Sequence, residues 1–248
     1  MKTAELKEKY LYREKLWQAI RAETDSIFLA FSMGKDSLCA YIELAKWGGF
    51  RILPYYMYLV PGLEFVESEI KRFEDIFQTK IHQIPHPAMF RWLRNLSFQA
   101  PENCLIIEEI IDRNYEYEDI IDGLRKQLCA HNWWIADGVR CADSPMRRLA
   151  ISKHGPITQK KLKFHAVWDY SVEEVRRVIS ESGIALPVDY RLFGRTFDGL
   201  DYRFLGPIIE NFPDDYQRIK AFFPLVEAEI FRYEKMNMPI KKKNFFKG

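Results

Sequence analysis

Hydrophobic and polar positions along the chain form short blocks that predict helices and strands in turn. The first 22 residues have the spacing of an amphipathic helix, whose apolar face carries Leu6, Tyr10, Trp17 and Ile20. The apolar run Ile27–Phe31 is too short for a core helix and suits a buried parallel strand. A polar hexamer, residues 32–37, separates this strand from the next helical pattern.

The same alternation continues to the end of the chain. Further strands are expected at residues 51–60, 80–84, 133–137 and 164–167. Helices are expected at residues 38–48, 63–77, 172–183 and 214–235, with residues 88–131 mainly helical. Residues 141–163 and 184–212 are expected to be loops. Ser171 and Glu174 have the spacing of a capping box at the start of the helix at 172–183.

Parallel strands need crossover connections, so this alternation predicts an α/β fold. We expect a Rossmann-like, doubly wound, mainly parallel sheet of five strands with flanking helices and a helical C-terminal extension. The boundaries would give an N-terminal helix over residues 1–25, one α/β domain over 26–183, and an extension of loop and helix over 184–248.

Composition narrows the class of protein. The 248 residues are 48% hydrophobic and 29% charged, which suffices for a substantial core. No apolar run approaches the roughly 20 residues of a membrane span, and the charged N-terminus lacks an apolar signal core. We therefore expect a cytoplasmic protein with no membrane partner. The net charge of +2 neither favours nor excludes nucleic acid as a partner.

The four cysteines are widely spaced, at positions 39, 104, 129 and 141. No pair has the Cys-x-x-Cys spacing of a zinc, iron–sulfur or dithiol site. The histidines also lack metal-ligand spacing. We therefore expect reduced thiols, no iron–sulfur cluster and no zinc.

The hexamer after the first strand has the chemistry of a phosphate-binding loop. It consists of Ser32, Met33, Gly34, Lys35, Asp36 and Ser37. Gly34 would let the backbone approach a phosphate, Lys35 supplies a positive charge, and the following helix directs amide groups at an anion. Asp36 could cap the helix or help to hold a magnesium ion. An ordinary capped strand-to-helix turn is the alternative interpretation.

The hexamer resembles the pyrophosphate-binding loop (PP-loop) of the adenine-nucleotide alpha-hydrolase superfamily, which includes N-type ATP pyrophosphatases. Three later segments are similar, in order, to motifs of its phosphoadenosine-phosphosulfate reductase family. They are Pro61–Phe65 with Glu67 and Ser68, Asp137–Arg140 with Asp143, Ser144 and Arg147, and Trp168–Val175. The resemblance covers residues 26–195.

This resemblance implies the residues of two sites. The adenine-nucleotide site would comprise Ser32, Met33, Gly34, Lys35, Asp36, Ser37, Tyr58, Leu59, Val60, Gly138 and Arg140. An acceptor site would comprise Asp143, Ser144, Arg147 and Arg195. Lys35 and Arg140 would take part in catalysis, and Arg140 and Arg147 could clamp a phosphate or sulfate. Surface ion pairing of the two arginines with Asp143 is the alternative.

The sequence departs from the family at two points. The acidic residue that many relatives carry at the end of the second strand is replaced by Leu59-Val60, and the C-terminal cysteine of the reductases is missing. Reduction requires a nucleophilic thiolate. Cys141, close to Arg140 in sequence, is the remaining candidate, with a small buried filler as its alternative.

We therefore expect an enzyme that binds ATP and Mg²⁺ and cleaves the α–β phosphate bond. An acceptor would be adenylylated and pyrophosphate released, with the α/β domain holding the nucleotide and the C-terminal extension on the acceptor side. A nucleic acid, a nucleoside precursor and sulfate all stay open as acceptor, as does the oligomeric state. The alternatives are a phosphoadenosine-phosphosulfate reductase or sulfurtransferase, and a non-catalytic nucleotide sensor that acts with a nucleic-acid-processing partner.

Basic residues between Lys153 and Lys163, and again around Arg195, could contact an anionic acceptor or a nucleic-acid backbone, with nearby aromatic side chains stacking on bases. A solvated basic loop is the alternative, and it also accounts for the three lysines of the C-terminal tail.

Overall fold

The computed structural model describes residues 12–236, which form an α/β fold around one six-stranded sheet. The strand order is β3-β2-β1-β4-β6-β5. The chain divides into two compact units. Unit 1 comprises the described residues through Tyr56, with Thr79–His82 and Leu124–Leu186, and unit 2 comprises Met57–Gln78, Gln83–Gly123 and the residues from Pro187 onward.

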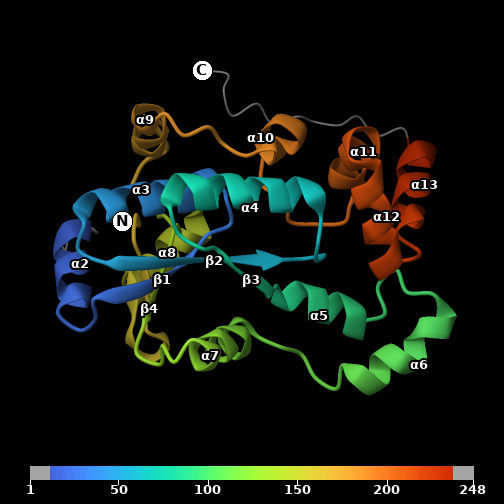
Figure 1. The fold of residues 1–248 in the computed structure, drawn as a ribbon, viewed down its shortest axis with the longest axis horizontal. Helices are drawn as coiled ribbons and strands as arrows, with labels where there is room; N and C mark the ends of the chain where they lie inside the picture. The colour runs from blue at the N-terminus through green and yellow to red at the C-terminus, as the bar shows by residue number, and fades with distance from the viewer. Residues whose placement is uncertain (1–11, 237–248) are drawn as a thin grey trace. The chain divides into compact units, whose positions relative to one another are not determined.

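Unit 1 contains the centre of the sheet (Figure 1). Its elements are α2 (Arg13–Arg21), β1 (Ser26–Ala30), α3 (Lys35–Trp47), most of β2 (Arg51–Tyr58), β4 (Trp134–Asp137), α8 (Pro145–His154), β5 (Ile157–Thr158), the 3₁₀ helix η1 (Gln159–Lys161), β6 (Lys163–His165) and α9 (Val172–Ser182). β1 is parallel to both β2 and β4, and β4 is parallel to β6. The doubly wound, mainly parallel sheet is therefore confirmed.

The strand order reverses direction between β1 and β4, which are neighbours in space but far apart in the chain. In doubly wound sheets, ligands bind at such a switch point, outside the carboxyl ends of the two strands. Two segments leave the sheet there, the hexamer after Ala30 and the residues after Asp137. The topology thus brings together two of the segments that the sequence singled out.

The core of unit 1 is formed by apolar strand residues and by helices that cover them. Ile27, Phe28 and Leu29 of β1 are completely buried, as expected for a central parallel strand. α3 packs against α9. Trp17 of α2 donates a hydrogen bond from its indole nitrogen to the Ala166 carbonyl at 3.1 Å, so the N-terminal helix is fastened to the end of β6.

Unit 2 is mainly helical. Its elements are α4 (Glu64–Phe77), most of β3 (His82–Pro85), α5 (Pro87–Arg94), α6 (Pro101–Ile110), most of α7 (Tyr117–Gln127), α10 (Val188–Phe193), α11 (Tyr202–Asn211), α12 (Pro213–Phe222) and α13 (Glu227–Met236). α4 begins after the Pro61-Gly62 turn, and the buried carboxylate of Asp215 accepts hydrogen bonds from the amides of Glu64 and Phe65 at 2.7 and 3.0 Å. α12 thereby caps α4.

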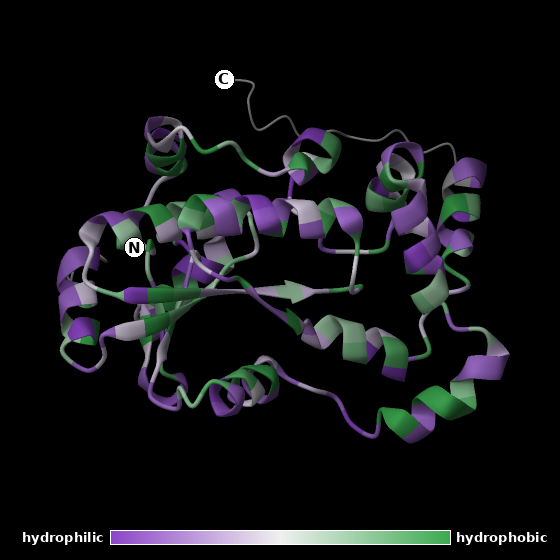
Figure 2. Ribbon diagram, viewed as in Figure 1, coloured by the Kyte–Doolittle hydropathy of each residue, from purple (hydrophilic) through white to green (hydrophobic). Residues whose placement is uncertain are grey.

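An exposed apolar helix also belongs to unit 2. α6 has no buried residue, and Leu105, Ile106 and Ile110 are each more than half exposed. The hydrophobic colouring of this helix is visible in Figure 2.

Two expectations for residues 141–165 were wrong. The sheet has six strands rather than five, because the short β5 pairs antiparallel with β6. The stretch 141–163 is not a loop, since it also contains α8 and η1. Ser144 caps α8 by accepting a hydrogen bond from the Arg147 amide at 3.1 Å, and Pro145 occupies the first turn, where it costs no hydrogen bond.

The expected loop at 184–212 and the expected single helix at 214–235 were also wrong. The former contains α10 and α11, and the side chain of Asp201 caps α11. The latter is divided into α12 and α13 at residues 223–226, where Pro224 interrupts the pattern. The helical character of the C-terminal part was predicted correctly.

The capping box was also predicted correctly: Ser171 and Glu174 exchange hydrogen bonds with each other's backbone amides. The expected helical positions Leu6 and Tyr10 and the lysine-rich tail lie outside the described residues. Within the part of the chain that the structure describes, no helix is both long enough and apolar enough to cross a membrane.

Candidate functional site

The hexamer forms a tight turn between β1 and α3. Met33 lies in the left-handed region at φ 59°, an unfavourable conformation for a residue with a side chain, and its side chain is buried. Gly34 is the N-cap residue, so no side chain caps the first amide groups of α3. The turn therefore leaves the positive end of the α3 dipole uncapped at the switch point.

The two serine hydroxyls of the hexamer lie next to each other. Their Oγ atoms are 3.3 Å apart, and Ser37 donates to the Gly34 carbonyl at 2.9 Å. The Gly34 amide makes a long contact of 3.4 Å with the Ser32 hydroxyl. These contacts order the turn, in which Ser32 is exposed and Ser37 is buried.

Gly138 brings the end of β4 against this turn. A Cβ at Gly138 would lie 2.6 Å from the backbone carbonyl carbon and oxygen of Asp36 and 2.8 Å from the Ser37 nitrogen. Real Cβ contacts are not that short, so only glycine fits this approach. The segments after β1 and after β4 are therefore in backbone contact.

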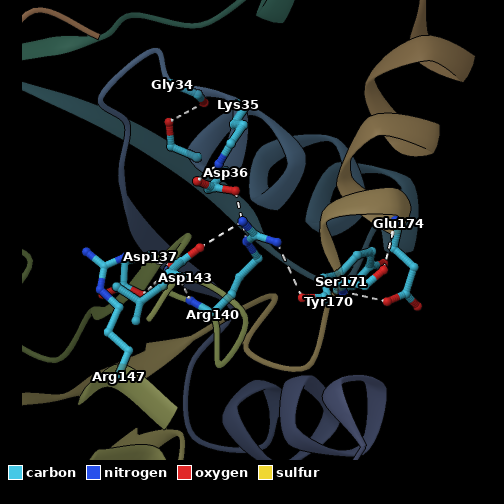
Figure 3. A network of polar contacts seen from close by, with 12 residues as sticks. Gly34, Lys35, Asp36, Asp137, Arg140, Asp143, Arg147, Tyr170, Ser171 and Glu174 are labelled. Atoms are coloured by element: carbon cyan, nitrogen blue, oxygen red, sulfur yellow. Dashed lines mark hydrogen bonds and ion pairs between the residues drawn. The ribbon is translucent and has the colours of Figure 1, made fainter. Parts of the chain in front are cut away.

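Arg140 is buried beneath the hexamer, with 1% of its surface exposed. Its guanidinium lies between two carboxylates and a carbonyl (Figure 3). The Nε atom is 2.9 Å from Asp36 Oδ1, an Nη atom is 2.7 Å from Asp143 Oδ1, and the other Nη makes a long contact of 3.4 Å with the Tyr170 carbonyl. Since Nε and Asp36 Oδ1 are not aligned as a hydrogen bond, their attraction is mainly electrostatic.

Asp36 and Asp143 are each shared between two cations. Asp36 pairs with Lys35 as well as with Arg140. Asp143 pairs with the exposed Arg147 at 2.6 Å and accepts a hydrogen bond from the Arg140 amide at 3.0 Å. In the structure both arginines thus pair with Asp143, which is the alternative interpretation left open above, although Arg140 does so in the interior rather than at the surface.

A polar cluster that the sequence did not indicate lies beside Gly138. Asp137 Oδ1 is 2.7 Å from Nδ1 of His165, and its Oδ2 is 2.9 Å from the Lys163 ammonium. Burial acts to raise the pKa of Asp137, but the hydrogen bond and charge of His165 and the charge of Lys163 lower that pKa to about 2. The cluster depends on the β4–β6 register, which places Asp137 opposite His165.

The remaining predicted site residues belong to unit 2. Leu59 and Val60 are buried, and the Tyr58 carbonyl accepts a hydrogen bond from the His86 amide at 2.8 Å. Arg195 is half exposed and pairs with Asp198. Their nucleotide and acceptor roles stay predictions.

Cys141 is buried, and burial raises its pKa to about 11. Its thiol is therefore protonated at neutral pH, which disfavours a nucleophilic role. Among residues 12–236, no group of three or more histidine, cysteine, aspartate or glutamate side chains is arranged to hold a metal ion.

No protein-family model matches the chain, and no curated protein matches it significantly. Among solved structures, an NH3-dependent NAD synthetase from Campylobacter jejuni subsp. jejuni NCTC 11168, in complex with the nitrate ion, is similar. The sequence identity is 11% and the TM-score is 0.43, over 96% of this chain and 98% of that chain. A similarity this distant does not indicate a shared reaction.

Proposed function

We propose that the chain binds ATP at the hexamer and transfers its adenylyl group to an acceptor, releasing pyrophosphate. One observation carries the proposal. A turn with the composition of a PP-loop lies at the switch point of a doubly wound sheet, with the backbone of Gly138 packed directly against it.

The local chemistry of the turn supports phosphate binding. The uncapped amides at the start of α3 and the exposed Ser32 hydroxyl are donors for anionic oxygens, and the Ser37 hydroxyl would join them by turning away from the Gly34 carbonyl. Gly34 allows close approach of the backbone. The resemblance of the hexamer to the loop of the adenine-nucleotide alpha-hydrolase superfamily agrees with this assignment.

Lys35 would supply the mobile charge. Its ammonium pairs with Asp36, whose other oxygen faces Arg140. Because Arg140 can by itself neutralise Asp36, Lys35 can turn from Asp36 to a phosphate without leaving an unpaired carboxylate in the interior. Arg140 is then a positioning residue rather than a phosphate ligand.

The reaction needs no protein nucleophile. An acceptor oxygen forms a bond to the α-phosphorus, the bond from the α-phosphorus to the bridging oxygen breaks, and the acceptor proton is released to solvent. The chain contributes positioning and charge neutralisation at the leaving pyrophosphate. Asp143, Ser144 and Arg147 follow Arg140 directly and would border the acceptor.

The residues at this site do not fit a resident magnesium ion. Asp36, the one carboxylate of the hexamer, already pairs with two cations, and among the described residues no group of three or more metal-binding side chains includes it. The proposed reaction therefore uses no metal ion held by the protein.

Titration calorimetry with Mg·ATP, together with an assay of pyrophosphate release, tests the proposal. We expect Lys35→Ala and Ser37→Ala to weaken ATP binding at least tenfold, since each removes a phosphate contact. Lys46→Ala, in the last turn of the same helix, is the matched control and should bind like the wild type.

Equal affinity in all four proteins would overturn the proposed site. ATP binding without pyrophosphate release, whatever acceptor is offered, would replace the enzyme with a nucleotide-sensing module.

A further inference from the structure

We propose that unit 1 carries a nucleic-acid-binding surface, formed by α8, β5, η1 and the start of β6. We call it the basic surface and define it by four exposed side chains, Arg148, Lys153, Lys160 and Lys161. It would hold the phosphate backbone of a nucleic acid.

The charge pattern is the first observation. The 25 residues from Ser144 to Trp168 contain six lysines and arginines and no aspartate or glutamate. The whole chain is nearly balanced, with 37 basic and 35 acidic residues. The positive charge is therefore concentrated in one continuous stretch.

The fold turns this stretch outward. α8 has a single buried residue, Ile151, so nearly all of its circumference is exposed. β5 and β6 form an antiparallel pair, with η1 as the connection between them. Lys160 and Lys161 lie on that connection, while Lys153 ends α8 just before β5 begins.

The two acidic residues that most closely precede the stretch are already paired. Asp137 is held by His165 and Lys163, and Asp143 by Arg140 and Arg147. Arg125 of α7 adds a further cation, since its guanidinium donates to the Lys161 carbonyl at 3.2 Å. The exposed Glu23, which accepts a hydrogen bond from Gln159, is an acidic neighbour from α2.

The basic side chains of this surface are spread over an exposed helix and a turn. Such an arrangement suits a ligand that carries negative charges at regular intervals. Nucleic acid presents such a row of phosphates, and lysine and arginine contacts to them supply most non-specific affinity. The stretch begins at Ser144, directly after the Arg140–Asp143 segment beneath the hexamer. A nucleic-acid strand that extended from this surface along α8 to the Arg140–Asp143 segment would bring a functional group toward the α-phosphorus. This acceptor role rests on the proposed ATP function, whereas the binding itself does not.

Fluorescence anisotropy with the full chain tests the surface. The probes are a labelled 20-nucleotide DNA single strand, its duplex and the RNA of the same sequence, titrated at several salt concentrations. The test variant carries Arg148→Gln, Lys153→Gln, Lys160→Gln and Lys161→Gln. The control removes four exposed charges elsewhere in unit 1, by Arg21→Gln, Lys46→Gln, Arg176→Gln and Arg177→Gln.

We expect the wild type and the control to bind at least one probe with similar, steeply salt-dependent affinity. If all four side chains contact a duplex, the plot of log affinity against log salt concentration becomes shallower in the test variant. The magnitude of its slope decreases by about 3 to 4, at roughly 0.9 per contact. The ratio of wild-type to test-variant affinity would therefore be about a hundredfold larger at 50 mM salt than at 200 mM.

Three results would overturn the inference: no binding of any probe by the wild type at low salt, equal loss in the test and control variants, or no change in the test variant. Lys35→Ala separates this inference from the proposed function. If this variant loses ATP but keeps the nucleic acid, the basic surface stands as a separate binding site. If the wild type binds nucleic acid but not ATP, the surface stands and the acceptor role falls.

Discussion

The buried Arg140 pairs with the partly exposed Asp36, with Nε 2.9 Å from Oδ1, and so joins the segment after β4 to the first turn of α3. Removing Arg140 would leave Asp36 with Lys35 and Asp143 with Arg147, so each carboxylate would keep one of its two cations. The pair therefore stabilises unit 1 and also holds Asp36 in position next to Lys35.

Arg140→Ala tests this relationship. Because Asp36 and Asp143 each lose one of two cations and a buried side chain is removed, we expect the free energy of unfolding, measured in urea, to fall by about 1 to 3 kcal/mol. ATP affinity should fall as well, since Lys35 must then stay on Asp36. Arg148→Ala, the exposed control, should change stability by no more than about 0.5 kcal/mol. Similar losses of stability in both variants would show that the contacts of Arg140 contribute no more than an exposed side chain does.

Gly138→Ala tests the close approach of the two segments. The added Cβ would collide with the backbone of Asp36, which cannot move as a side chain could. We expect a loss of about 1 to 3 kcal/mol of stability and a clear loss of ATP binding.

Gly123→Ala is the matched control for this substitution, because a Cβ there meets nothing within 4 Å and alanine favours a helix. It should be neutral or slightly stabilising. Normal ATP affinity in Gly138→Ala would contradict the assigned geometry.

The sequence was sufficient for elements whose signals are local. The apolar run of β1, the hexamer and Gly48, which ends α3, lie within some twenty residues of each other. Each of them is consistent with a strand, a turn and a helix in that order. α8 was missed for the opposite reason. This helix buries only Ile151, so its sequence lacks the apolar periodicity that predicts a helix. Ser144 and Pro145 are nevertheless typical residues for the start of a helix.

The contacts of the candidate site could not be predicted because they depend on register and on crossing chain segments. Arg140 was expected to face a ligand, but its contacts to Asp36 and the Tyr170 carbonyl come from segments that are distant in sequence. The Asp137–His165 pair likewise exists only because β4 and β6 align at those residues.

Asp137 should make the free energy of unfolding depend on pH. Its pKa is lowered to about 2 in the folded protein, against an ordinary value of 3.8, so its ionised form stabilises the fold above about pH 4. This stabilisation, about 2 kcal/mol, is lost as the pH falls toward 2. In urea unfolding between pH 2.5 and 6, the difference between the wild type and Asp137→Asn should shrink as the pH falls. A constant difference would contradict the assignment, and exposed Asp214→Asn serves as the control.

Asp189 of α10 should act in the opposite direction. Burial, with the charge of Glu69, raises its pKa to about 6, although the Phe197 amide donates to its Oδ2 at 2.8 Å; its Oδ1 has no hydrogen-bond partner. The folded form therefore holds a proton that the unfolded form has lost, and stability falls by about 3 kcal/mol as the pH rises from 4 through 6.

Asp189→Asn should remove that slope, so the variant gains stability relative to the wild type as the pH rises. Unfolding curves in urea between pH 4 and 8 measure the difference. Parallel pH profiles for the two proteins would show that Asp189 does not titrate in this range.

The most direct test of the central claim is the ¹H–¹⁵N spectrum of the deuterated full chain, recorded as Mg·ATP is added. We predict the largest shift changes at the amides of Gly34, Lys35, Ser37 and Gly138, with little change at Gly123 and Gly183. Saturating ATP that leaves the hexamer amides unmoved, or that shifts only signals elsewhere, would contradict an ATP site at the β1–β4 switch point.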